Sequence, residues 1–172
     1  MKDCKKWSAS EAESPFEEDP GLVQEDKTLN LNPEHKVGIR VIDNQHEWII
    51  RATHALSEEL YVLSPDIDDL PVDVLDELAE KYKKLLDALN SHFKLEIDLL
   101  KKYGNRKKAF EHEAANNKLL IEDLGGGWNG WGKIKGEPVI YIYRKLILIR
   151  MHFANHIIKS DIHDLLKECL DK

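Results

Sequence analysis

The chain has 172 residues and a mass of 19.9 kDa, which fits one domain or one domain with a tail. Charged residues make up 33% and hydrophobic residues 42%, a globular composition that argues against wholesale disorder and repeat arrays. The formal net charge of −7 argues against nucleic acid as a partner, because nucleic-acid binding demands a basic surface. No apolar run approaches the roughly 18–20 residues of a membrane-spanning helix, so we expect no membrane span.

The two cysteines, Cys4 and Cys169, lie at opposite ends of the chain and do not support a disulfide framework. The charged opening from Met1 to Lys6 leads into no apolar stretch, so no secretory signal is visible. Both features favour the reducing cytoplasm as the location of the protein.

The first part of the chain, residues 1–36, lacks helical periodicity. It contains Ser14-Pro15 and an acidic run that ends at Pro20, which favour irregular backbone. We therefore expect an irregular N-terminal arm over residues 1–36 and a folded domain over residues 37–172. Whether the arm is a disordered tail or is held against the domain by Trp7 stays open.

Apolar residues recur at steps of three and four along four segments, as amphipathic helices require. We expect helices over residues 41–63, from Pro71 to Tyr103, over residues 106–124, and from Pro138 to about Leu170. No segment shows the strict alternation of a half-buried strand. Four such helices, joined mostly by short loops, predict an all-α fold, namely an antiparallel up-down-up-down four-helix bundle.

Histidines fall on the apolar faces of these helices, where polar groups are costly unless they are paired or bound to metal. A single buried histidine is usually an ordinary hydrogen-bonded core residue, but here every helix contributes at least one. A metal ion or a pair of ions would satisfy all these groups together, so the sequence predicts a metal site in the core. The polar residues on or beside the apolar seams are His46, His92, Glu96, His112, His152 and His156.

The types of ligand narrow the choice of metal. Imidazole and carboxylate suit iron, manganese or zinc, and the absence of cysteine from the set excludes zinc fingers and iron–sulfur clusters. A ferritin-like di-iron site needs Glu-x-x-His on two helices, and no glutamate lies three residues before any of the 8 histidines. A haem held by two histidines stays open, although it would leave Glu96 unexplained.

Three motifs of this chain resemble those of the hemerythrin family, in particular the bacterial hemerythrins. Residues 37–46, Val-Gly-Ile-Arg-Val-Ile-Asp-Asn-Gln-His, are similar to the family's opening signature. Residues 92–96 are similar to its His-Phe-x-x-Glu, and residues 156–161 to its closing His-Ile-x-x-x-Asp. The motifs stand in the family's order on the first, second and fourth expected helices, and the resemblance covers residues 37–170.

The resemblance implies a non-haem di-iron site that binds O2 reversibly. Two histidines would ligate one iron, two histidines would ligate the other, and two carboxylates would bridge the pair. Carried over by position, the first pair is His46 and His92, the bridges are Glu96 and Asp161, and the second pair is His112 and His156.

The chain departs from the family's pattern at the second iron. The family expects a further histidine where this chain has Asn116, and it usually has tryptophan where this chain has His152. Our hypothesis is that the missing ligand has moved across the bundle, so that His152 serves this iron. The alternative is that Asn116 is itself a weak oxygen ligand.

Three functions are compatible with these residues. The first is an O2-binding protein for storage, delivery or sensing. The second is a di-iron enzyme acting on peroxide or nitric oxide, because one missing histidine could leave a second open position on iron. The third is a helical binding module whose site has lost its metal.

Overall fold

The computed structural model describes residues 36–63, 70–103, 106–124 and 138–159. Their helices are α1 (Arg40–Leu63), α2 (Val72–Tyr103), α3 (Arg106–Asn117), the π-helix η4 (Lys118–Asp123) and α4 (Pro138–Lys159). These ranges contain no strand, so the prediction of an all-α fold is confirmed for them. The expected arm, apart from Lys36, and the expected continuation of the last helix lie outside the described residues.

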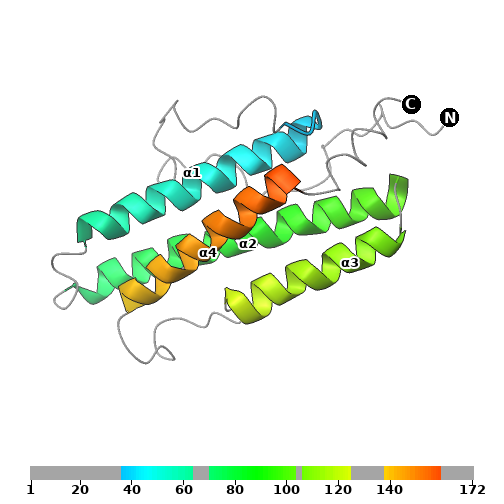
Figure 1. The fold of residues 1–172 in the computed structure, drawn as a ribbon. Helices are drawn as coiled ribbons and strands as arrows, with labels where there is room; N and C mark the ends of the chain where they lie inside the picture. The colour runs from blue at the N-terminus through cyan, green and yellow to red at the C-terminus, as the bar shows by residue number, and fades with distance from the viewer. Residues whose placement is uncertain (1–35, 64–69, 104–105, 125–137, 160–172) are drawn as a thin grey trace.

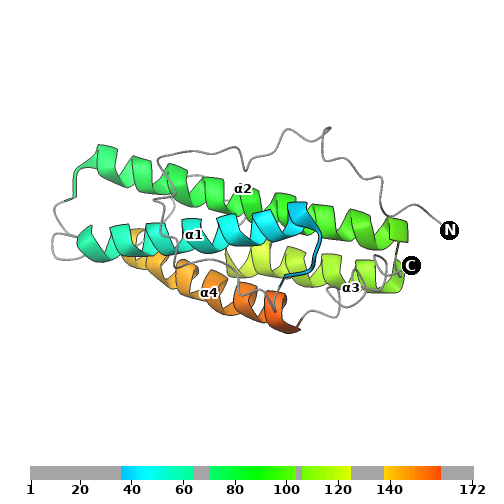
Figure 2. The same ribbon diagram turned by 90° about the horizontal axis from the view of Figure 1, so that it is seen from above.

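The four long helices lie alongside one another (Figures 1 and 2). Helix α2 packs against α1, α3 and α4, and α1 also packs against α4. The main core joins apolar side chains of α1, α2, η4 and α4 with Leu124, the residue that follows η4. Leu56, Tyr82, Leu124 and Leu146 are almost completely buried. Burial of this apolar surface is the main stabilising term of such a fold. Among the described helices, none is both long enough and apolar enough to cross a bilayer.

The entry into α1 is a tight turn that the sequence specifies locally. Gly38 has a φ of 84°, in the left-handed region that glycine adopts without steric cost. The Asp43 carboxylate accepts hydrogen bonds from the backbone N–H groups of Val37, at 2.8 Å, and Gly38, at 3.0 Å. Asp43 also lies in the first turn of α1, where a negative charge complements the helix dipole. The turn therefore fixes where α1 begins, less than two turns before His46.

The third expected helix changes from α to π geometry at Lys118. The Leu124 N–H donates to the Leu119 carbonyl at 2.9 Å, five residues back instead of four. The Tyr82 hydroxyl donates to the Leu124 carbonyl at 3.0 Å, and Lys145 Nζ donates to the Asp123 carbonyl. Side chains from α2 and α4 thus hold the end of η4. Short π-helices occur frequently at functional sites.

Candidate metal centre

A single carboxylate lies at the centre of the candidate site. Glu96, on α2, is fully buried, with 0% of its surface exposed. Four imidazoles surround it, one from each long helix. Their Nε2 atoms lie 4.0 Å (His46), 3.4 Å (His92), 2.8 Å (His112) and 3.1 Å (His156) from a carboxylate oxygen of Glu96. We call these five residues the Glu96 cluster.

Helical spacing and helix packing explain the convergence. His92 and Glu96 are four residues apart on α2, so they lie one above the other on the same face. The α4 residue His156 brings its Nε2 to 3.3 Å from Nε2 of His92. Aromatic rings close the site, since Phe153 packs edge-on against His46 and His92 with ring centroids 5.5 and 5.6 Å apart.

Gln45 sets the tautomer of His92. Its side-chain oxygen lies 3.1 Å from Nδ1 of His92, and a glutamine oxygen can only accept, so Nδ1 carries the proton. In the neutral ring, Nε2 then presents its lone pair to Glu96 and His156. Metal-binding histidines typically donate their second ring N–H in this way. Sequence reasoning gave Gln45 no role, although it stands within the opening motif directly before His46.

The charge of Glu96 is compensated within the cluster. Burial opposes its ionisation, but the positive charges of His92 and His156 and hydrogen bonds from His112 and His156 hold the pKa of this carboxyl well below its usual range. The carboxylate is therefore an anion that requires cationic neighbours. A metal cation would supply that charge while leaving the imidazoles neutral and able to act as ligands.

The donor atoms fit a metal ion. One ligand atom each from His46, His92, Glu96 and His156 lie within 4.8 Å of one another. The cluster could therefore hold a metal, and imidazole with carboxylate is the donor set that suits iron, manganese or zinc. His112 extends the set, since its Nε2 contacts Glu96 Oε2 at 2.8 Å.

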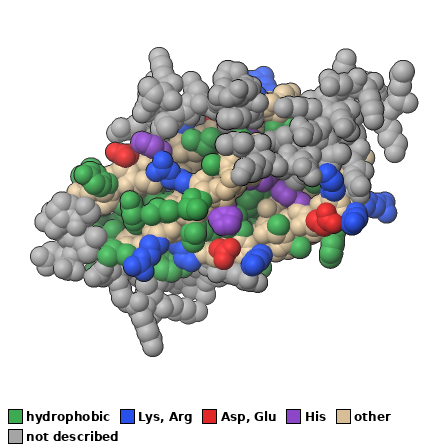
Figure 3. All heavy atoms as spheres, in the orientation of Figure 1, with side chains coloured by type: hydrophobic (Ala, Val, Ile, Leu, Met, Phe, Trp, Pro, Cys, Tyr) green, Lys and Arg blue, Asp and Glu red, His purple; other side chains and the backbone are tan. Residues whose placement is uncertain are grey.

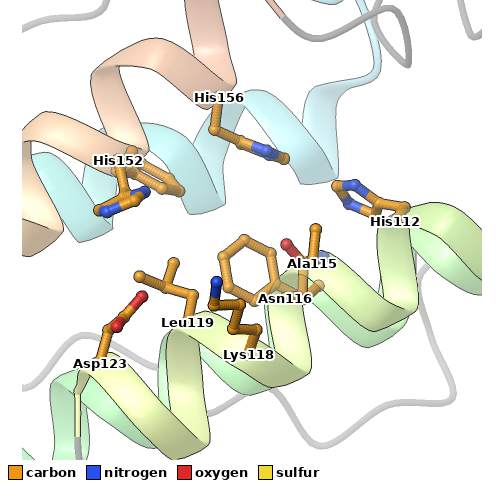
Figure 4. A pocket seen from close by; sticks show the side chains of 10 residues that line it. His112, Ala115, Asn116, Lys118, Leu119, Asp123, His152 and His156 are labelled. Carbon is orange, nitrogen blue, oxygen red and sulfur yellow. The ribbon is translucent and has the colours of Figure 1, made fainter.

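One side of the Glu96 cluster opens into a cavity of about 350 Å³ between α3–η4 and α4 (Figure 4). The side chains of His46 and His92 are 0% exposed, whereas those of His112 and His156 are each 11% exposed. A small molecule would thus reach the cluster from the side of His112 and His156. The face drawn in Figure 3 shows histidine side chains among apolar ones.

The structure brings together five of the seven predicted ligands: His46, His92, Glu96, His112 and His156. His152 lines the cavity but is exposed, and it makes no hydrogen bond or ion pair with another described residue. In Figure 4 it lies at the far end of the cavity from His112, facing Asp123. Asp161 lies outside the described residues, and its bridging role stays a prediction.

Asn116, the position where a ligand histidine was expected, is buried, with 7% of its surface exposed. It lies one turn after His112 and lines the same cavity. Among the described residues its Nδ2 has no hydrogen-bond partner. A buried donor without a partner costs about 1–3 kcal/mol, so this amide is a feature that the packing alone does not explain.

We expect Gln45→Leu to weaken metal binding about 10–100-fold, the usual cost of losing a group that orients a ligand. The substitution frees the His92 ring to rotate and to move its proton to Nε2. Gln45→Glu keeps an acceptor and should bind metal more tightly than Gln45→Leu. Competition with a chromophoric chelator measures the affinity, with the exposed neighbour variant Asn44→Leu as control. Equal metal affinities for Gln45→Leu and Asn44→Leu would show that Gln45 has no role at the site.

No protein-family model, curated protein or solved structure matches the chain. What can be said of its class follows from its own geometry: the described residues form an all-α fold with a buried His/Glu cluster that could hold a metal ion.

Proposed function

We propose that the chain forms an antiparallel up-down-up-down four-helix bundle that holds two non-haem iron ions and binds O2 reversibly. The packing of α2 against α1 and α3, and of α1 against α4, supports this arrangement. The connection between α2 and α3 comprises only residues 104–105, which favours antiparallel neighbours. Iron and O2 are inferred from the resemblance of the three motifs to hemerythrins.

The observation that carries the proposal is that imidazoles lie beside both carboxylate oxygens of Glu96. Oε1 lies 3.4 Å from His92 and 4.0 Å from His46. Oε2 lies 2.8 Å from Nε2 of His112, and Nε2 of His156 lies 3.1 Å from each of the two oxygens. A carboxylate that has imidazoles beside both of its oxygens is suited to bridge two ions. Bound iron would supply the electrons that O2 binding draws on.

The chain itself would control access, orientation and charge. Gln45 orients His92, and the fully buried Glu96 compensates positive charge at the cluster. Phe93 and Phe153 both line the cavity beside His156, so the approach to the cluster is largely apolar. An apolar approach favours entry of a small uncharged gas over water and slows loss of an oxygen adduct by oxidation.

A second candidate function is a di-iron enzyme that consumes peroxide or nitric oxide. The size of the cavity favours this enzyme. Its volume of about 350 Å³ is many times the ~30 Å³ that one water molecule occupies in the liquid. Lys118, Asp123 and His152 also line it, so its outer part is polar and able to move protons. Such an opening allows water and substrate to enter together.

Absorbance measured while O2 is added to and removed from the iron(II)-loaded protein tests the proposal. We expect two irons per chain and an oxygen-dependent charge-transfer band that disappears when O2 is removed. Rapid irreversible oxidation with consumption of added peroxide would instead support the enzyme. Protein that contains no iron after expression with iron supplied would contradict both and support a metal-free binding module.

A further inference from the structure

The outer face of α4 carries an apolar stripe between two arginines. Tyr143, Ile147 and Met151 follow one another at steps of four residues, and 45%, 41% and 59% of their surfaces are exposed. At about 100° per residue these side chains lie within an arc of about 80°, with Arg150 at one edge and Arg144 at the other. Both arginines are exposed, and neither forms an ion pair with another described residue. We call these five residues the α4 stripe.

The composition of the α4 stripe is that of an interaction surface. Aromatic residues, methionine and arginine are the types enriched in protein interfaces. Exposed apolar surface rimmed by polar residues also marks such sites. Helix α4 contains lysine and arginine but no aspartate or glutamate, although the chain as a whole has a net charge of −7. The α4 stripe therefore favours a partner that is both apolar and negatively charged.

A segment of that chemistry lies in the chain itself, before α1. Residues 11–26 contain seven Asp or Glu residues and no Lys or Arg, together with Phe16, Leu22 and Val23. We call them the acidic segment, and they lie outside the described residues. We propose that the acidic segment binds the α4 stripe of the same chain. No residue of the α4 stripe belongs to the Glu96 cluster, so this binding does not depend on a bound metal.

The connection to α1 is long enough for the acidic segment to reach the α4 stripe. Helix α1 begins and α4 ends at the same end of the bundle (Figure 1), and the rings of His46 and His156 have centroids 6.1 Å apart. At 1.5 Å per residue, the distance along the bundle from Arg40 to the level of Tyr143 is about 28 Å. Residues 27–36 span at most about 33 Å when fully extended.

Charge would direct the acidic segment to α4 and not to another apolar surface. Tyr61 and Val62 are each 72% exposed at the end of α1, but Glu58 and Glu59 directly precede them. Like charges there would repel the acidic segment. Exposed ion pairs are individually weak, so burial of apolar side chains must supply part of the affinity. A short flexible connection holds a segment at an effective concentration in the millimolar range, so weak contacts are sufficient.

Disulfide formation within the full chain tests the proposal. Cys4→Ser and Cys169→Ser remove the native thiols. Ser14→Cys then places a thiol in the acidic segment, and Ala154→Cys places a second one on α4, at an exposed position beside the α4 stripe. Equilibration with reduced and oxidised glutathione gives the effective concentration of one thiol at the other.

The matched control combines Ser14→Cys with Ala114→Cys on α3. Ala114 and Ala154 are both exposed, and each lies two residues from one of the stacked rings of His112 and His156. The two alanines are therefore at similar levels of the bundle but on different helices. We expect the effective concentration to be at least tenfold higher at position 154 than at position 114.

Reversal of charge shows whether recognition is specific. Replacement of residues 17–19, Glu-Glu-Asp, by three lysines should lower the effective concentration at position 154 to that at position 114. This variant alters no described residue, so it leaves the sequence of the helices intact. Arg144→Glu combined with Arg150→Glu should have the same effect. When both sets of reversals are combined, opposite charges face each other again, and the effective concentration should return toward the parental value.

Three outcomes would overturn the proposal. Equal effective concentrations at positions 154 and 114 would leave the α4 stripe to a separate partner protein. Disulfide-linked dimers that increase with protein concentration would show that a second copy of the chain occupies it. An unchanged effective concentration after the reversal at residues 17–19 would show that charge does not direct the acidic segment to α4.

Discussion

Replacement of Glu96 by alanine is expected to abolish metal binding, whereas replacement of Glu113 by alanine leaves it intact. Glu96 is fully buried and contacts the imidazoles of all four helices, so its loss removes both a ligand and the only carboxylate of the Glu96 cluster. The loss of affinity should exceed the roughly 10–100-fold that an orienting group contributes. Iron and zinc quantification after dialysis measures the effect.

Glu113 is the matched control because it is a glutamate beside a cluster histidine but on another helix face. Successive residues on a helix are rotated by about 100°, which turns Glu113 away from the site. Its side chain is 43% exposed and lies 3.3 Å from Lys101. Glu96→Gln adds a second comparison, since it retains the shape and loses the charge. Metal retained in Glu96→Gln and Glu96→Ala would place the binding site elsewhere.

The helices of this chain were predictable because their signals are local. The break before Pro71 and the glycines before Pro138 mark boundaries, and the structure begins α2 at Val72 and α4 at Pro138. The π-helix η4 was not predictable. Its hydrogen bond to the fifth residue back is accompanied by contacts from Tyr82 and Lys145, which are distant in sequence.

In the site, too, some residues could be predicted from local sequence patterns, whereas others depend on how the helices pack. Periodicity placed His46, His92 and Glu96 on helix faces that turn inward, and the structure joins them. Gln45 could not be assigned from periodicity, because its contact with His92 spans 47 residues and depends on how α1 packs against α2. The unpaired amide of Asn116 is likewise a result of packing, since the residue type alone would suggest either a ligand or an ordinary polar contact.

We expect His152→Ala to remove one of the two proposed iron ions. His152 lies on α4 one turn before His156 and lines the same cavity as His156 and His112, at the end away from His112. Its imidazole forms no hydrogen bond or ion pair with another described residue. Binding an ion at His112 and His156 would therefore not require the His152 ring to break such a bond. Iron per chain, measured on protein loaded anaerobically, should fall by half.

The adjacent variant Met151→Ala serves as control, because Met151 is 59% exposed on the same helix and does not line the cavity. His156→Ala should cost more than His152→Ala, since His156 contacts both Glu96 and His92. If His152→Ala retains both ions with parental affinity, His152 is a polar residue of the cavity wall and the ligand has not moved across the bundle. In that case the second iron must complete its coordination with another group, and Asn116 becomes the residue to test next.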